Sequence, residues 1–226
     1  MKRLAVLGVL VLAVAACGRD GSGGAHGTAT LWVTRDRGAH VLLTARVPAG
    51  ETAMQALERR AKVETRYGGR YVQAVDGVAG SLTGRHDWFF FVNGLEADRS
   101  AAEVTLRPGD VEWWDYRAWP PLSVPVVVGA FPQPFVSDGR AAVVVGSGAT
   151  ARTLARLVHG SVAAAAPQDA NVLRIVPGGG FTARRDGGRV VFTLGARDAV
   201  RLAADPTLAR FRYEGLHRRR LDGAGQ

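Results

Sequence analysis

The segment DWFFFVNGLEADRSAAEVTLRPGDVEWWDYRAW, residues 87–119, holds four of the chain's five tryptophans and decides its fold. Asn93-Gly94 predicts a tight β-hairpin, because Asn-Gly fills the two positive-φ positions of a type I′ turn. Pro108-Gly109-Asp110 predicts a second turn, and a strand follows over 111–117. The segment therefore predicts antiparallel strands rich in aromatic side chains.

Both faces of these strands are apolar. Because alternate residues of a strand point to opposite faces, Trp88, Phe90 and Val92 share one face, and Phe89 and Phe91 share the other. The later strand has Val111 and Trp113 on one side, and Trp114 and Tyr116 on the other. A sheet with one solvated face alternates apolar and polar residues. We therefore expect a cover for the second face, either the rest of the chain or a ligand or partner.

The first 16 residues predict a signal peptide. A short basic start, Met1-Lys2-Arg3, is followed by an uncharged apolar run over 4–16, which is short for a bilayer span. The run ends in Val14-Ala15-Ala16-Cys17, which resembles the bacterial lipobox. The alternative is an ordinary secretory signal followed by an incidental cysteine.

The lipobox resemblance implies that the mature protein begins at Cys17, acylated on its sulfur and its new amine. Two or three acyl chains anchor a protein durably to a lipid bilayer. The resemblance thus implies a lipid-anchored protein on the extracytoplasmic face of the cell membrane. Residues 17–27, rich in Gly and Ser, predict a flexible tether. Cys17 is the only cysteine, so we expect no disulfide within the mature chain.

The charge is strongly positive and carried almost entirely by arginine. The formal net charge is +9, and lysine occurs only at positions 2 and 62. Such a strong preference for arginine over lysine is typical of a GC-rich genome. Positive charge favours anionic lipid or envelope polymers, and we expect no nucleic-acid partner for a protein outside the membrane.

The first domain is expected over 28–118. Strands over 28–35 and 40–47 predict a hairpin. Thr52 and Gln55 match the capping box of a helix over 52–63, whose apolar stripe contains Met54, Leu57 and Ala61 and whose last turns are basic. A strand over 70–75 and a loop over 78–86 precede the aromatic hairpin. This order is that of a β-grasp domain, a mixed sheet that holds one helix.

Four motifs in this region, TAMQAL, YGGRYVQAVDGV, DWFFFVNG and LRPGDVEWWDY, give the family resemblance. Together they resemble a bacterial domain family related to the C-terminal domain of transcobalamin and intrinsic factor, over about Thr28 to Trp119. In the vertebrate relatives this domain closes over one face of cobalamin, together with a helical domain. The resemblance implies a β-grasp-like fold and a cobalamin-like (corrinoid) ligand.

A Pro-rich linker is expected over 119–125, and a small α/β domain over 126–216. The sequence predicts a helix over 150–159, a helix over 196–204, and strands at 126–131, 141–145, 162–166, 172–176, 181–185, 189–194 and 209–213. Residues 217–226 form a basic tail. Such a tail is either a solvated end or a contact for anionic head groups or wall polymers.

The turn Gly146-Ser147-Gly148 precedes a helix and fits G-x-G-x-x-A. A dinucleotide site uses such glycines to bring backbone N–H groups to a pyrophosphate. The alternative, which we favour, is a glycine-rich turn into a capped helix. No cofactor is therefore predicted.

No catalytic constellation stands out. None of the five histidines has metal-ligand spacing to another ligand residue, and no nucleophile elbow or paired-carboxylate motif occurs. His86-Asp87 beside Trp88 is the nearest polar group, and either contacts a ligand or closes a loop. We expect no metal site and no enzyme, although a hydrolase of unrecognised type stays open.

Two function classes follow. The first is a lipid-anchored binding module for a corrinoid or another large flat ligand. Its expected ligand-binding residues are Tyr71, Trp88, Phe90, Asn93, Gly94, Trp113, Trp114 and Tyr116. The alternative is a structural or interaction lipoprotein of the cell envelope. In that case the aromatic sheet face docks the chain's own second half, or a partner such as an envelope or transporter protein.

Overall fold

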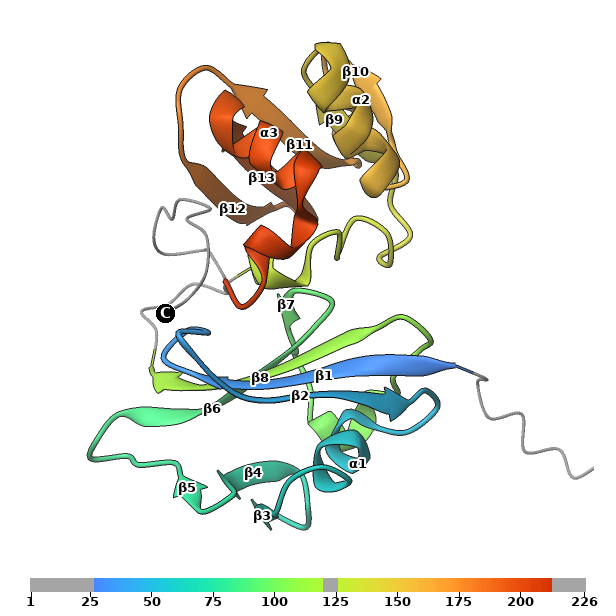
Figure 1. Cartoon of the computed structure of the whole chain (residues 1–226). Helices are drawn as coiled ribbons and strands as arrows, with labels where there is room; N and C mark the ends of the chain where they lie inside the picture. The colour runs from blue at the N-terminus through green and yellow to red at the C-terminus, as the bar shows by residue number, and fades with distance from the viewer. Residues whose placement is uncertain (1–26, 120–125, 213–226) are drawn as a thin grey trace, which may run out of the picture.

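The computed structural model describes residues 27–119 and 126–212 (Figure 1). The predicted signal peptide, Cys17, nearly all of the tether, the linker over 120–125 and the basic tail lie outside the described residues.

Strand β8 (Val111–Ala118) is the centre of the first sheet, whose strand order is β2-β1-β8-β6-β7. Its other strands are β1 (Thr28–Arg35), β2 (His40–Pro48), β6 (His86–Val92) and β7 (Leu95–Glu96). Strand β1 pairs with β8 in parallel, and β6 pairs with β8 in antiparallel fashion. The sheet is therefore mixed, and the predicted α+β class with a β-grasp-like first sheet is confirmed.

The Asn93-Gly94 turn has the predicted geometry, with φ of 52° and 84° at its two residues. The register places Phe90 opposite Trp114 and Phe91 opposite Trp113. The aromatic side chains consequently gather on both faces of the sheet as cross-strand pairs, the contacts that stabilise antiparallel strands.

Helix α1 (Ala53–Glu58) covers one face of the sheet (Figure 1). The predicted capping box is present, because the Thr52 hydroxyl accepts from Gln55 N and the Gln55 side chain accepts from Thr52 N. The predicted extent to residue 63 is wrong. Val63 instead begins β3 and pairs with Val75, so the expected basic last turns do not exist.

A separate three-stranded sheet lies beside α1, with the order β3-β4-β5. Its strands are β3 (Val63–Arg66), β4 (Tyr71–Val75) and β5 (Val78–Ala79). The predicted loop over 78–86 is therefore partly wrong, since β5 opens it and His86 already belongs to β6. The short 3-10 helix η1 (Ala101–Glu103) begins after Ser100, whose hydroxyl accepts from Ala102 N.

The second half of the chain covers the opposite face. Trp32, Phe91 and Trp113 are buried there against Val127 and Ala130, with Phe89, Val111 and Phe211 packed around them. The rings of Trp32 and Phe211 lie 5.0 Å apart, centroid to centroid. The chain's own second half is thus a cover for one aromatic face.

Two charged residues are buried on this same face and are paired. Asp115 accepts from the Thr34 hydroxyl at 2.6 Å and from the backbone N–H groups of Arg37 and Gly38. The Arg117 guanidinium lies 4.0 Å above the Phe89 ring and 3.6 Å from a Glu96 carboxylate oxygen. Burial of these charges is tolerated because each has partners of opposite charge or polarity.

The second unit is an α/β layer structure with the strand order β10-β9-β11-β13-β12. Its strands are β9 (Ala142–Val145), β10 (Ser161–Ala163), β11 (Asn171–Val176), β12 (Phe181–Asp186) and β13 (Arg189–Gly195). Helices α2 (Gly148–Leu157) and α3 (Ala196–Ala204) lie side by side on one face of the sheet (Figure 1). The β12–β13 hairpin and α3 are confirmed.

Two predicted strands of this half are wrong. The run 126–131 forms one bridge, Val126 to Leu95, and then the 3-10 helix η2 (Val128–Ala130). Pro206–Ala209 forms the 3-10 helix η3, so no strand begins at 209 within the described residues. Val127 and Ala130 of the first run and Phe211 of the second pack together in the cluster between the two units.

Candidate functional site

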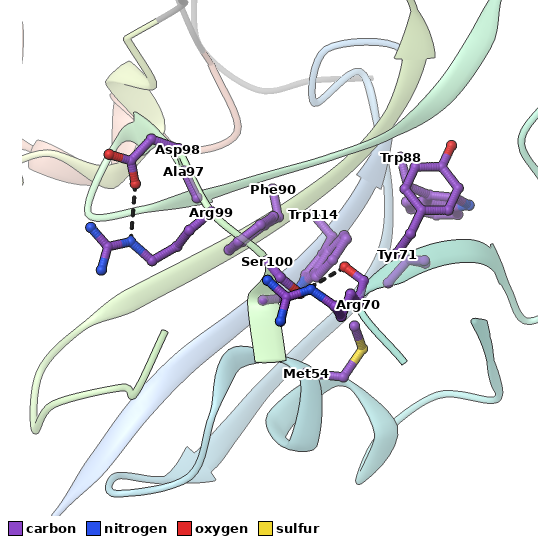
Figure 2. Close-up of a pocket in the computed structure, with 12 residues that line it drawn as sticks. Met54, Arg70, Tyr71, Trp88, Phe90, Ala97, Asp98, Arg99, Ser100 and Trp114 are labelled. Carbon is purple, nitrogen blue, oxygen red and sulfur yellow. Dashed lines mark hydrogen bonds and ion pairs between the residues drawn. The ribbon is translucent and has the colours of Figure 1, made fainter. Parts of the chain in front are cut away.

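An open pocket of about 430 Å³ lies on the α1-facing side of the first sheet. We call it the aromatic groove, and Figure 2 shows its lining. The lining residues are Met54, Arg70, Tyr71, Val72, Trp88, Phe90, Ala97, Asp98, Arg99, Ser100, Ala101 and Trp114. Four of the eight expected ligand-binding residues meet here: Tyr71, Trp88, Phe90 and Trp114.

The floor of the groove is a stacked ring pair. Phe90 and Trp114 are cross-strand partners whose ring centroids lie 4.8 Å apart at an interplanar angle of 19°. Only Phe90 is partly exposed, whereas Trp114 is 3% and Trp88 is 6% exposed. The floor therefore offers a small apolar surface on a rigid support, with most of the aromatic area already packed in the core.

A buried carboxyl holds Trp114 in place. Trp114 Nε1 donates to Glu112 Oε1 at 2.5 Å, and Glu112 is fully buried on the same strand. Burial raises the pKa of Glu112 to about 8, which outweighs the opposite effect of the Trp114 hydrogen bond. Glu112 Oε2 has no hydrogen-bond partner among the described residues. This carboxyl is therefore mostly protonated at neutral pH.

Tyr71 forms one end of the groove, beside Trp88 (Figure 2). Its hydroxyl donates to Asp87 Oδ2, while Asp87 Oδ1 accepts from Trp88 N at 2.9 Å. Burial, followed by the Asp87 hydrogen bond, raises the pKa of Tyr71 to about 12. Tyr71 therefore stays neutral, and its ring is held in one orientation.

Tyr71 also separates the groove from a second hollow of about 460 Å³, which is lined by Arg66, Tyr67, Gln73 and Leu82 among others. Tyr67 and Leu82 are strongly exposed at its rim.

The other end of the groove is polar and charged (Figure 2). The Ser100 hydroxyl donates to the Arg70 carbonyl at 2.7 Å and thereby joins the segment 97–101 to β4. Arg70 forms an ion pair with Glu103, and Arg99 pairs with Asp98 at 3.1 Å. Both guanidinium groups are well exposed. The groove thus combines an apolar floor with cationic donors at its rim.

The other four expected residues lie elsewhere. Trp113 is 1% exposed on the opposite sheet face, where its Nε1 donates to the Thr34 hydroxyl at 2.8 Å. Tyr116 shares the Trp114 face, but it packs on Trp88 and His86 and donates to the Ala79 carbonyl at 3.0 Å. It does not line the groove.

Asn93 and Gly94 shape the turn. The Asn93 side chain donates to Asp110 and accepts from Val111 N at 2.9 Å. The Gly94 carbonyl accepts from Val127 N at 2.6 Å, so this turn contacts the second unit.

The segment 97–101 is the main part of the groove that sequence reasoning missed. It lies between two turns and carries no family motif. One signal was available, since Ser100 and Glu103 have the spacing of a capping box, which indicates a short helical turn. That turn, η1, supports this side of the groove.

His86 and Ser147, the other polar residues considered in the sequence, do not line the groove. Within residues 27–119 and 126–212, no group of three or more His, Cys, Asp or Glu side chains could hold a metal ion. His86 Nδ1 lies 2.6 Å from the Gly84 carbonyl, so this ring closes a loop. The glycine-rich turn does lead into α2, but the predicted cap is wrong, because the Ser147 side chain makes no capping hydrogen bond. Among the same residues, no helix is both long and apolar enough to cross a bilayer.

A family model described as a domain of unknown function, DUF4430, matches residues 50–118, which contain the whole lining of the groove. A search of curated proteins found no match.

Two solved structures are similar to part of the chain. Haptocorrin in complex with Cbi is 14% identical with a TM-score of 0.36, and the similarity covers 42% of this chain and 25% of haptocorrin. A proposed metal-binding protein from Ruminococcus gnavus is 14% identical with a TM-score of 0.35, covering 42% of this chain and 99% of that protein. The match to haptocorrin therefore spans only a quarter of that protein.

Proposed function

We propose that this protein is a non-catalytic ligand-binding module that is held on the extracytoplasmic face of the cell membrane through acylated Cys17. In this proposal the aromatic groove binds one face or edge of a large flat ligand, such as a corrinoid. The observation that carries the proposal is the groove itself. One aromatic face is closed by the second half of the chain, whereas the other remains open above the Phe90–Trp114 stack.

The lining suits a flat ligand with polar side groups. An apolar ring system gains by covering Phe90 and the Tyr71 ring, because both offer apolar area in fixed orientations. Arg70 and Arg99 at the rim present guanidinium donors, which suit carbonyl, amide or phosphate groups at a ligand's edge. The resemblance to transcobalamin-type domains supports the choice of a corrinoid as the first probe.

A titration with cobalamin and cobinamide tests this proposal, read by ligand absorbance and by quenching of tryptophan emission. We expect a saturable response. Ala97→Phe places a ring in the groove and is expected to weaken binding about tenfold or more. Ala102→Phe adds the same bulk at an exposed position on η1 outside the lining and should bind like the wild type.

The possible outcomes distinguish a wrong choice of ligand from a wrong choice of binding site. If neither corrinoid gives a saturable response up to the high-micromolar range, the corrinoid assignment fails. If haemin, another flat tetrapyrrole, binds and Ala97→Phe weakens it, the groove still functions for a different ligand. If Ala97→Phe and Ala102→Phe bind equally well, the groove is not the site.

The anchor has its own test. Cys17→Ala removes the sulfur that would carry the diacylglyceryl group, so we expect the protein to lose both lipid incorporation and normal signal-peptide processing. Radiolabelled palmitate incorporation and the mass of the mature N-terminus check this in a bacterial host. Equal incorporation in the wild type and the variant would contradict the anchor.

A second candidate function is that of a structural envelope lipoprotein. The observation in its favour is the covered face, where Trp113 packs against Phe211 at a centroid distance of 6.0 Å. In this case the aromatic residues only join the two halves of the chain. A lack of binding to every flat ligand, with the fold intact, would favour it.

A further inference from the structure

The net positive charge of the described residues comes entirely from the second unit. Residues 27–119 contain 12 basic and 12 acidic residues, so their formal charge is zero. Residues 126–212 contain 11 arginines and five aspartates, so their formal charge is +6. The two units therefore differ strongly in charge, although they are nearly equal in length.

A genomic preference for arginine does not explain this difference. Both units contain the same number of arginines, 11 each. What differs is the number of acids, which falls from 12 to five. A bias in codon usage replaces lysine by arginine, but it leaves the balance of acids and bases unchanged. Codon usage therefore does not account for the low number of acidic residues in the second unit.

Helices α2 and α3 carry half of this net charge, because they contain four arginines and one aspartate. Helix α2 contains no acid, and Arg152 and Arg156 are exposed one turn apart on its outer face. Helix α3 exposes Arg197, while its only acid, Asp198, is buried and accepts from Gly180 N at 2.5 Å. The outward face of the two helices therefore carries arginines and no exposed carboxylate. We call it the arginine face.

The arginines of this face are available to a partner. Arg152, Arg156 and Arg197 form no ion pair with any residue in the described ranges. Arg156 donates only to the neighbouring Thr153 hydroxyl, at 2.9 Å. Val200 lies one turn after Arg197 on the same side of α3 and is 55% exposed. The arginine face thus contains an exposed apolar side chain among cations.

We propose that the arginine face docks on the phosphate-rich surface of an anionic lipid bilayer. The guanidinium fork matches phosphate oxygens, and a basic side chain near an anionic bilayer gains from its negative surface potential. Val200 fits this partner better than a soluble polyanion, because an apolar side chain among cations can enter the headgroup region. The proposal does not depend on the aromatic groove or on Cys17.

The test uses a chain that begins at Gly18, which keeps every described residue and lacks the proposed anchor. Co-sedimentation is measured with vesicles of phosphatidylcholine alone and with phosphatidylglycerol added. We expect binding only to the anionic vesicles and release at high salt. The triple variant Arg152→Gln/Arg156→Gln/Arg197→Gln should lower the partition coefficient by on the order of a hundredfold.

A matched control removes equal charge from the first unit, as Arg60→Gln/Arg85→Gln/Arg107→Gln, and should bind nearly as the wild type. Equal losses in both triples would overturn the proposal, because net charge alone would then govern binding. Equal binding to both vesicle types, or none to either, would also overturn it. If polyphosphate binds and anionic vesicles do not, the partner is a soluble polyanion and the lipid assignment is wrong.

Discussion

Glu112 is an ionisable residue in a position where a charged side chain is unfavourable. Its carboxyl is fully buried beneath the groove, with Trp114 Nε1 as its hydrogen-bond donor. Burial raises its pKa from the ordinary 4.5 to about 8. Between these two values the folded protein keeps a proton that the unfolded chain has lost. The free energy of unfolding must therefore fall as the pH rises through this window.

Glu112→Gln is expected to remove this pH dependence. The wild type should lose up to about 4 kcal/mol of stability between pH 5 and pH 8, whereas the variant should change much less. Urea unfolding at several pH values measures both slopes. Glu58→Gln, an exposed substitution on α1, should keep the wild-type slope. Equal slopes in wild type and Glu112→Gln would show that this carboxyl is ionised in the folded state.

The sequence predicted which face of a strand each side chain occupies better than it predicted which residues line the groove. Strand alternation separates Trp88 and Phe90 from Phe91, as observed, because the period of two is a property of the backbone. The groove also needs Arg99 and Ser100, which reach it only through the path of the chain after β7. The Ser100–Glu103 spacing signals the turn η1, but no local pattern encodes the path that brings Arg99 and Ser100 to the groove.

Among the elements, the β6–β7 turn has the tightest steric requirement. Gly94 has φ of 84°, and a Cβ there would lie 2.9 Å from the Val127 carbonyl oxygen. Gly109 also has φ of 84°, but a Cβ at that position would meet nothing within 4 Å. Substituting alanine at each glycine therefore distinguishes two destabilising effects. Gly109 reports the backbone strain alone, whereas Gly94 reports the strain together with a steric clash against the second unit.

We expect Gly109→Ala to destabilise the protein by about 1–2 kcal/mol, the ordinary cost of a left-handed alanine. Gly94→Ala should cost about 1–3 kcal/mol more, because the turn must also move away from Val127. Thermal unfolding of both variants measures the difference. If the two variants unfold at the same temperature, the turn and the second unit are not tightly packed.

Element boundaries failed where tertiary pairing overrode local pattern. The stripe of Met54, Leu57 and Ala61 has helical spacing, yet the helix ends at Glu58, because Val63 is needed as a strand partner of Val75. The run 126–131 is β-branched and apolar, but it is buried between the units as η2 instead of joining a sheet. Propensity alone cannot distinguish these outcomes.

For the whole molecule, Phe211 is one of the side chains that link the two units. Its ring contacts Trp32 and Trp113, and its backbone lies where a Cβ on Gly38 or Gly129 would collide with it. The glycines thus allow the end of the described chain to pass between the units.

Phe211→Ala is expected to cost about 2 kcal/mol and to uncouple the two units. In the wild type, tryptophan emission and far-ultraviolet circular dichroism should report one common unfolding curve. In the variant the two curves should separate, since all five tryptophans belong to residues 27–119, the first unit. Val200→Ala removes a half-exposed side chain and should keep one curve, and coincident curves in Phe211→Ala would contradict the linking role.

The parallel pairing of β1 with β8 also governs how the chain reaches this fold. Thr34 and Trp114 touch across that pair although 80 residues separate them. Whether the chain leaves a ribosome or a membrane channel, β1 and β2 emerge well before β8, and a lone two-stranded ribbon is only marginally stable. The apolar side chains of β1, which include Leu31, Trp32 and Val33, stay exposed until β8 is available to pair with it. During this time the incomplete chain is prone to aggregate. The first sheet therefore cannot complete its folding until β8, its last long strand, is available. A chaperone that shields exposed hairpins would act before that point.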